Sequence, residues 1–130
     1  MYKRQDTYNA NPESVAAALE TLAALPCDGK RIAALGIMAE LGTHAEEAYR
    51  RTGQLAAEKN LRLIVVGEAA ETIATAACDA GGEADFFTDR EEAASFLKTQ
   101  SSSGDIVLFK GSRAAAMEEV MKTTFPPTNN

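Results

Sequence analysis

Apolar runs and stretches of helical periodicity alternate along this chain from residue 12 onward. Short apolar runs bounded by turn-forming residues predict strands at residues 31–36, 61–67, 84–88 and 105–111. Apolar positions at helical spacing predict helices at residues 12–25, 43–59, 69–80, 90–98 and 112–122. This alternation, with strands as continuously apolar as LIVV, predicts an α/β domain with a Rossmann-like, mostly parallel sheet and helices on both faces.

Residue types at the expected helix ends support these boundaries. Asn11 suits the N-cap of the first helix, and Pro12 suits its first helical position. Thr43 and Glu46 have capping-box spacing at the start of the second helix. The glycine pair at residues 81–82 is typical of a helix C-terminus and should end the third helix.

The length of 130 residues fits one domain, and a hydrophobic content of 45% can form a core without a metal or a disulfide. A helix that begins at residue 12 should follow a strand, yet MYKRQ at residues 1–5 is polar and makes a poor one. We therefore expect residues 1–5 to be a non-native or truncated lead-in, with a genuine basic N-terminal arm as the alternative. The domain is expected over residues 6–123, followed by an unstructured tail at residues 124–130.

Charge and cysteine content argue against several classes of protein. A net charge of −6 disfavours a nucleic-acid surface, which needs a basic patch. The chain has no run of about 18 apolar residues that could span a membrane. No apolar segment of a signal peptide follows MYKRQ. Cys27 and Cys78 stand far apart and outside any CxxC motif, which indicates two reduced thiols in a cytosolic protein.

Familiar nucleotide-binding and catalytic motifs do not occur in the chain. It has neither GxxxxGK[ST] nor GxGxxG, and its single histidine, His44, has no partner at catalytic spacing. Chemistry is then expected at the carboxyl ends of the parallel strands, where open α/β sheets bind ligands. Three polar loops lead into expected helices there, at residues 6–12, 36–42 and 110–113.

The first loop, DTYNANP, carries the polar residues Asp6, Tyr8, Asn9 and Asn11. Their side chains can read a sugar or a base by hydrogen bonds, and the following helix offers N–H groups at its first turn. Asparagine and aspartate also build helix caps and Asx-turns. Composition alone leaves a nucleotide site and an elaborate helix cap equally open.

The second and third loops contribute charged residues. The second loop, at residues 36–42, has a glycine at each end, and its one charged residue, Glu40, is either functional or solvated. In the third loop, Lys110 and Arg113 flank Ser112 at an expected strand-to-helix junction. Cations and the N–H groups of a helix start would converge there on a carboxylate or phosphate. The alternative is a solvated lysine at a strand end.

Three segments, DTYNANP, GIMAELG and KGSRAAAME, occur in this order within an α/β frame, and they make the chain similar to the C-terminal domain of the Mur ligases. The resemblance covers residues 6–123 and is strongest to members that join D-alanyl-D-alanine to UDP-N-acetylmuramoyl-tripeptide. DTYNANP is its most specific element. The chain departs from many relatives at Ile37, where they carry an acidic residue, and at Tyr49, where they carry histidine.

The resemblance implies that the chain is a fragment of a three-domain, ATP-dependent bacterial ligase of the cytoplasm that acts in peptidoglycan and cell-wall synthesis. It implies that four residues help to hold ATP, namely Asp6, Tyr8, Asn9 and Asn11. It implies that three residues lie near the incoming dipeptide, namely Lys110, Ser112 and Arg113. Mg²⁺ would be held mainly by the central domain, which carries the P-loop, so the fragment alone is expected to be inactive. Its expected partners are the two substrates and the N-terminal and central domains of the same protein.

The competing interpretation is a stand-alone Rossmann-like nucleotide-binding module without catalysis. A receiver-like domain is disfavoured, because it needs a phosphorylatable Asp after its third strand, and residues 61–67 run into Glu68, Ala69 and Ala70 instead. A GxxxxGK[ST] motif upstream in the same gene would distinguish a ligase from a stand-alone module.

Overall fold

The computed structural model of the chain describes residues 2–5, 10–39, 41–112 and 115–126. In this part of the chain, five strands form one parallel sheet in the order β1-β5-β2-β3-β4. The strands are β1 (Tyr2–Gln5), β2 (Arg31–Leu35), β3 (Arg62–Val66), β4 (Glu83–Phe87) and β5 (Ile106–Lys110). This sheet confirms the α/β fold predicted from the alternating pattern.

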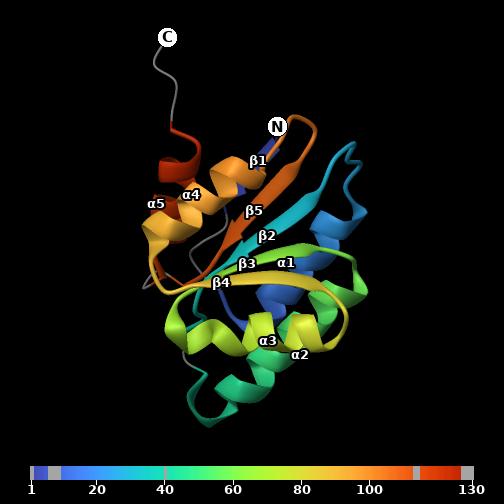
Figure 1. Cartoon of the computed structure of the whole chain (residues 1–130). Helices are drawn as coiled ribbons and strands as arrows, with labels where there is room; N and C mark the ends of the chain where they lie inside the picture. Colours follow the sequence, from blue (N-terminus) through green and yellow to red (C-terminus); the bar gives the residue numbers. More distant parts are fainter. Residues whose placement is uncertain (1, 6–9, 40, 113–114, 127–130) are drawn as a thin grey trace.

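The described α-helices cover both faces of the sheet. They are α1 (Pro12–Ala24), α2 (Ala45–Glu58), α3 (Glu71–Asp79), α4 (Arg90–Gln100) and α5 (Met117–Thr124). Helices α1, α2 and α3 lie against one face, and α4 and α5 lie against the other (Figure 1). Because helices bury both faces, the inner strands are apolar at nearly every position.

Alternating side chains of each inner strand contribute to two separate cores. Along β5, Ile106 and Leu108 belong to the core beneath α1, α2 and α3, whereas Val107 and Phe109 belong to the core beneath α4 and α5. All four side chains are buried. Successive strand residues point to opposite faces, so one strand supplies both cores.

The N-terminal segment differs from the sequence-based expectation. Residues Tyr2–Gln5, whose polar sequence makes a poor strand, form β1 and pair in parallel with β5. In the described sheet β1 lies at the edge, with β5 as its neighbour. An edge strand makes its backbone hydrogen bonds on one side and tolerates charged side chains, which explains why MYKRQ gives a weak strand signal.

The C-terminal helix also differs from the expectation. The pattern predicts it over residues 112–122, but α5 begins at Met117 and continues to Thr124, one residue into the expected tail. Ser112 instead starts a turn, because its carbonyl accepts a hydrogen bond from the Ala115 N–H at 2.9 Å. Beyond α5, the half-buried Phe125 packs against the core beneath α4 and α5.

Helix starts depend on local hydrogen bonds that the sequence signals in part. Asn11 caps α1 as predicted, with Pro12 at the first helical position. The predicted capping box of Thr43 and Glu46 is wrong: residues Gly42–His44 form a 3₁₀ turn, and α2 begins after it with no side-chain cap. The Glu46 carboxylate accepts a hydrogen bond from the Thr72 hydroxyl of α3 instead.

Helices α2 and α3 pack closely, and a glycine makes this possible. A Cβ atom on Gly53 of α2 would lie 2.2 Å from the Ile73 carbonyl oxygen and 2.9 Å from the Ala77 nitrogen of α3. Helix α3 ends as predicted: Gly81 has a φ of +87°, and the N–H of Gly82 donates to the Ala77 carbonyl at 2.8 Å. This pairing is a Schellman C-cap.

A buried carboxylate ties the loop before β2 to the loop before β5. Asp105, 1% exposed, accepts hydrogen bonds from the N–H groups of Lys30 at 2.7 Å and Ser102 at 2.8 Å. The Lys30 ammonium lies 3.1 Å from its second oxygen. Burial by itself raises the pKa of Asp105, but the two backbone bonds and the Lys30 ammonium together hold that pKa below its ordinary value.

Two further findings concern membranes and thiols. None of the described helices has the length and apolar character needed to cross a membrane. Cys27 and Cys78 are both free thiols. Cys27 is half-buried and its Sγ lies 3.2 Å from the Gly104 carbonyl, whereas Cys78 is exposed on α3.

Candidate functional site

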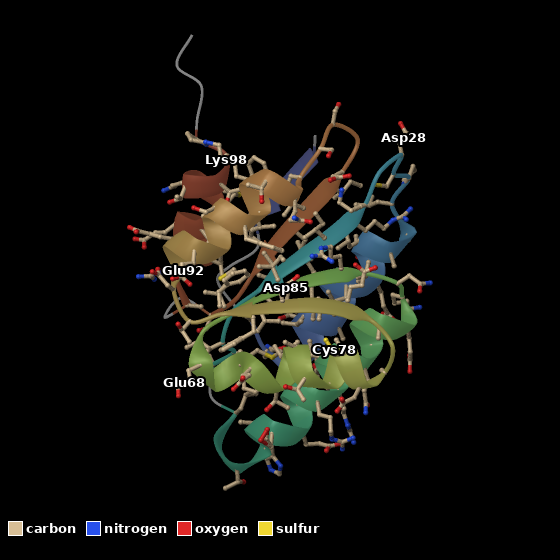
Figure 2. All side chains as sticks on the ribbon, in the orientation of Figure 1. Asp28, Glu68, Cys78, Asp85, Glu92 and Lys98 are labelled. Carbon is tan, nitrogen blue, oxygen red and sulfur yellow. The ribbon has the colours of Figure 1, made fainter. Side chains whose placement is uncertain are left out.

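The carboxyl edge of the sheet contains a topological switch between two neighbouring strands. Strand β2 leads into α2 on one face, while β5 beside it leads into α5 on the opposite face. Loops that diverge in this way leave a crevice, where open α/β sheets bind ligands. Figure 2 shows Glu68 and Glu92 at this end of the molecule and Asp28 at the opposite end.

Backbone hydrogen bonds join the loops at this edge. The N–H of Gly36 donates to the Lys110 carbonyl at 2.9 Å, and the N–H of Ser112 donates to the Ile37 carbonyl at 2.8 Å. The N–H of Ala39 donates to the Ala10 carbonyl, just before α1, at 3.1 Å. The three polar loops singled out in the sequence therefore meet, and hydrogen bonds between their backbones fix their relative positions.

A side chain from α2 supports the loop after β2. The phenol oxygen of Tyr49 accepts a hydrogen bond from the Met38 N–H at 3.0 Å, and both residues are buried. A glycine brings the neighbouring backbone close to the loop after β5, because a Cβ on Gly36 would lie 2.7 Å from the Ala115 Cβ. The 36–39 backbone is thus held from two sides.

The structure changes the expected anion site around Ser112. Lys110 and Ser112 are 2% and 4% exposed, so neither is a solvated surface residue. The N–H of Ser112 already donates to Ile37, and the first turn of α5 starts at Met117 and carries Glu118 and Glu119. The described helix α5 begins at Met117 and not at Ser112, where the pattern predicted its start. Lys110 is buried at the end of β5.

Asn11 has an observed structural role at the carboxyl edge. Its Oδ1 accepts a hydrogen bond from the Ser14 N–H at 2.9 Å, and the Ser14 hydroxyl accepts one from the Asn11 N–H at 3.0 Å. This reciprocal pair is a capping box. The other predicted site residues lie outside the described part of the chain, namely Asp6, Tyr8, Asn9, Glu40 and Arg113.

A cleft of about 510 Å³ opens at the carboxyl edge, on the side of α4 and α5. Its walls come from the ends of β2, β3 and β4 and from the loop before α5; they include Ile37, Val66, Gly67, Asp89, Arg90 and Ala115. Arg90 is the first residue of α4, its side chain is 47% exposed, and its guanidinium lies 3.7 Å from the Glu119 carboxylate.

Sequence reasoning missed Arg90. The preceding residue, Asp89, caps α4, because its Oδ1 accepts a hydrogen bond from the Glu91 N–H at 2.8 Å. The following arginine carried no motif, although its position directly after a strand-to-helix loop places it at the carboxyl edge of a parallel sheet. That topological position is the signal that could have found it.

Two other hollows lie elsewhere on the described surface. A groove of about 620 Å³ lies between α1 and α2, and its lining includes Pro12 and His44 at the starts of these helices. Glu47 at that groove is bonded to Arg50 and Arg51, which lower the pKa of its carboxyl and mark it as a surface ion-pair partner. A smaller hollow of about 260 Å³ lies at the amino ends of the strands, where Arg62 already pairs with Glu83.

The described residues do not form a metal site. Within residues 2–5, 10–39, 41–112 and 115–126, no three His, Cys, Asp or Glu side chains come together in a way that could hold a metal ion. The one histidine, His44, is exposed. The described edge therefore offers hydrogen-bonding groups, one buried ammonium and the guanidinium of Arg90.

An open parallel sheet with helices on both faces and polar loops joined at its carboxyl edge defines an α/β domain of the Rossmann-like class. The chain also matches the family described as Mur ligase, glutamate ligase domain, over residues 3–113. The chain therefore belongs to the Mur ligase family, in which it corresponds to the C-terminal domain.

Relatives within this family share its sequence and fold. The chain is 37% identical over 120 residues to UDP-N-acetylmuramoyl-tripeptide–D-alanyl-D-alanine ligase of Escherichia coli, an alignment that covers 90% of this chain and 25% of that protein. Identity to the ligase of the same name from Bacillus subtilis is 32%, over 90% of this chain and 26% of the relative. The chain thus spans about a quarter of the length of these relatives.

Solved structures give the same result. A crystal structure of MurF from Acinetobacter baumannii superposes with a TM-score of 0.82 at 30% identity, over 94% of this chain and 28% of that one. The MurF ligase from Thermotoga maritima in complex with ADP superposes with a TM-score of 0.75 at 32% identity, over 92% of this chain and 26% of that one.

Proposed function

We propose that this chain is the C-terminal domain of an ATP-dependent ligase that adds D-alanyl-D-alanine to UDP-N-acetylmuramoyl-tripeptide. The reaction would supply peptidoglycan precursor in the bacterial cytoplasm. The observation that carries the proposal is the joining of three motif-bearing loops at one sheet edge, with Ser112 N–H bonded to Ile37 and Ala39 N–H bonded to Ala10. The relatives at 37% and 32% identity, both named for this reaction, support it.

Part of the ATP site is proposed to lie in the loop before α1. ATP would supply the phosphoryl group that activates the tripeptide carboxylate, with Mg²⁺ held mainly by residues of a central domain. The relative solved with ADP supports nucleotide use. Asn11 fits this assignment, since it is exposed and its cap bond uses Oδ1. Its side-chain amide can still donate, and Asp6, Tyr8 and Asn9 are proposed to act with it.

The acceptor dipeptide is proposed to lie against the loop after β5, near Lys110, Ser112 and Arg113. Lys110 is buried at the end of β5, directly before this loop, and is proposed to lie close to the dipeptide. Ser112 would act through its backbone, which fixes this loop to the loop after β2. Arg113 would then orient the dipeptide through a charged hydrogen bond.

The whole gene tests this function. We expect two more domains upstream, including a GxxxxGK[ST] loop, because the chain spans about a quarter of its relatives. Purified full-length protein should release ADP only when both tripeptide and D-alanyl-D-alanine are present, and this chain alone should release none, because it has no phosphate-cradling loop. A locus with no upstream P-loop, together with nucleotide binding by the chain alone, would favour the stand-alone module instead.

An arginine variant tests the acceptor assignment in the same assay. Arg113→Ala in the full-length protein should lower kcat/KM for the dipeptide about ten- to a hundredfold, as expected for loss of a charged hydrogen bond. Tripeptide binding should stay nearly unchanged. A solvated Arg113 would instead change kcat/KM by less than about twofold.

A further inference from the structure

We propose that Arg90 binds the terminal carboxylate of the incoming dipeptide, in the cleft between the ends of β3 and β4 and the loop before α5. The inference rests on the proposed ligase function and deepens it, since it names the residue that distinguishes an acceptor with a free carboxylate from one without.

The first observation is the size and position of the cleft. Its volume of about 510 Å³ is within the range of roughly 300–1,000 Å³ that holds small ligands. It borders Ile37, whose carbonyl holds the Ser112 N–H, so the cleft adjoins the loop proposed to meet the dipeptide. A ligand seated in it would reach both that loop and the start of α4.

The second observation is the charge of the walls. Asp89 and Arg90 are the two charged residues among the described residues that line the cleft. Their charges cancel, and Glu119 lies 3.7 Å from the guanidinium. A triphosphate, with several negative charges, gains little in such a site. A zwitterion suits it, because its carboxylate meets Arg90 and its cationic end is not repelled.

The third observation is the chemistry of the remaining walls. The remaining walls are mixed, since Ile37, Val66 and Ala115 are apolar and Thr88 adds a hydroxyl. A short dipeptide suits such walls, because its methyl groups can lie against the apolar side chains and its peptide group can form hydrogen bonds. D-Alanyl-D-alanine has two methyl groups and one terminal carboxylate. A guanidinium can grip that carboxylate through two parallel hydrogen bonds.

Arg90 is available for this contact. Its side chain is 47% exposed, and 3.7 Å to Glu119 is longer than a hydrogen bond, so the ion pair is a weak competitor. Asp89 is occupied differently, since its Oδ1 caps the helix by accepting the Glu91 N–H. The neighbouring cap fixes the start of α4 and with it the origin of the arginine side chain.

Steady-state kinetics on the full-length protein test the inference, with the dipeptide varied at saturating ATP and tripeptide. The probes are D-alanyl-D-alanine and its C-terminal amide, which lacks the negative charge. Arg90→Ala should lower kcat/KM for the acid about ten- to a hundredfold and should change kcat/KM for the amide by less than about twofold. Arg90→Lys should give a kcat/KM for the acid between those of the wild type and Arg90→Ala, because lysine keeps the positive charge but lacks the two parallel N–H donors of the guanidinium.

Two control variants separate ligand binding from a structural role. Glu119→Gln removes the ion-pair partner of Arg90. If the ion pair has a structural role, Glu119→Gln should lower kcat/KM for the acid as much as Arg90→Ala does. The proposal predicts that Glu119→Gln leaves kcat/KM for the acid unchanged or raises it. Arg51→Ala removes an exposed, ion-paired arginine outside the cleft and should have no effect on either probe. Thermal melting of each variant checks that the fold is intact.

The outcomes distinguish this inference from the function on which it rests. If the wild-type protein ligates D-alanyl-D-alanine but Arg90→Ala keeps its kcat/KM and its preference for the acid over the amide, the inference is wrong and the proposed function stands. The inference is also wrong if Glu119→Gln reproduces the loss. If the wild-type protein shows no dipeptide-dependent ligation, the proposed function fails, and the role of Arg90 fails with it.

Discussion

The phenol of Tyr49 reaches from α2 to the carboxyl edge of the sheet, where its oxygen accepts the Met38 N–H at 3.0 Å. Both residues are buried, so water cannot replace this bond. The bond fixes the backbone next to Ile37, whose carbonyl in turn holds Ser112. One helix side chain therefore positions two loops of the proposed acceptor site.

Removing this hydroxyl should destabilise the fold measurably. Tyr49→Phe keeps the ring but leaves the buried Met38 N–H without its acceptor, so the free energy of unfolding should fall by about 1–3 kcal/mol. Urea denaturation measures it. The neighbouring Thr52→Val removes a hydroxyl that donates to the Ala48 carbonyl within α2, leaves no donor unpaired, and should cost less. Equal losses for the two variants would contradict the special role of Tyr49.

Asn11 offers a test that separates capping from nucleotide binding. Asn11→Ala should lower the stability of the chain by about 1 kcal/mol, because the cap bond to Ser14 is lost. Asn11→Asp keeps a cap acceptor and should retain nearly wild-type stability. In the full-length protein Asn11→Asp should still raise KM for ATP, because the amide donor is gone and a negative charge faces the nucleotide. A normal KM for ATP in this variant would leave capping as the whole role of the residue.

Asp105 predicts a pH dependence of stability with a definite sign. The pKa of Asp105 in the folded protein is held below that of an unfolded aspartate, which is about 3.9. Its contribution to the free energy of unfolding is therefore fully present above about pH 4, and it is lost as the pH falls through the pKa of the folded protein. Asp105→Asn should cost about 1.5–3 kcal/mol at neutral pH. The difference in free energy of unfolding between the wild type and Asp105→Asn should become smaller as the pH falls below about 4.

Denaturant titrations of both proteins across this pH range measure the effect. Asp79→Asn, at an exposed position of α3, provides a matched removal of one carboxylate and should cost less than about 0.5 kcal/mol. The difference in free energy of unfolding between the wild type and Asp105→Asn could instead stay constant down to the lowest pH. That result would show that the stabilising bonds of Asp105 do not depend on its charge.

Gly53→Ala should change stability in the direction opposite to helix propensity. Alanine normally stabilises a helix interior by about 0.5–1 kcal/mol relative to glycine. Here the new Cβ would lie 2.2 Å from the Ile73 carbonyl oxygen, a backbone atom that cannot rotate away, so we expect a loss of about 1–3 kcal/mol. Thermal or urea unfolding decides the sign. Ser95→Ala on the exposed side of α4 should give a small gain.

The apolar pattern predicted the inner strands and the helices that cover them, because burial on both faces demands continuous apolar runs. LRLIVVG is the clearest case: its core forms β3, buried from Leu63 onward. Strand β1 could not be found in this way, since an edge strand is held by backbone pairing that leaves little trace in side-chain type. The start of α5 was misplaced because Ala116, directly before Met117, has a left-handed φ of +50° that its residue type does not signal.

The sequence predicted which loops form the candidate site, but it did not predict how the residues of these loops contact one another. Parallel topology alone indicates that the ends of β2 and β5 face the same edge, so Lys110 and Ser112 were expected there. Their burial depends on how three loops pack, which single-sequence periodicity does not encode. Arg90 was missed because the cleft that it lines has walls from four separate segments, which the sequence pattern does not bring together.

The position of β5 between β1 and β2 has a consequence for how the domain is made. In the described sheet β1 has β5 as its neighbour, and Tyr2 pairs with Ile106 near the other end of the chain. Within this domain, β1 therefore lacks its described partner until β5, the last of the described strands, has been synthesised. Pairings so distant in sequence are slow to form, because the whole intervening chain must first be ordered. The β2–β3–β4 half can assemble earlier, so we expect folding from the middle outward, with the loops of the candidate site completed last.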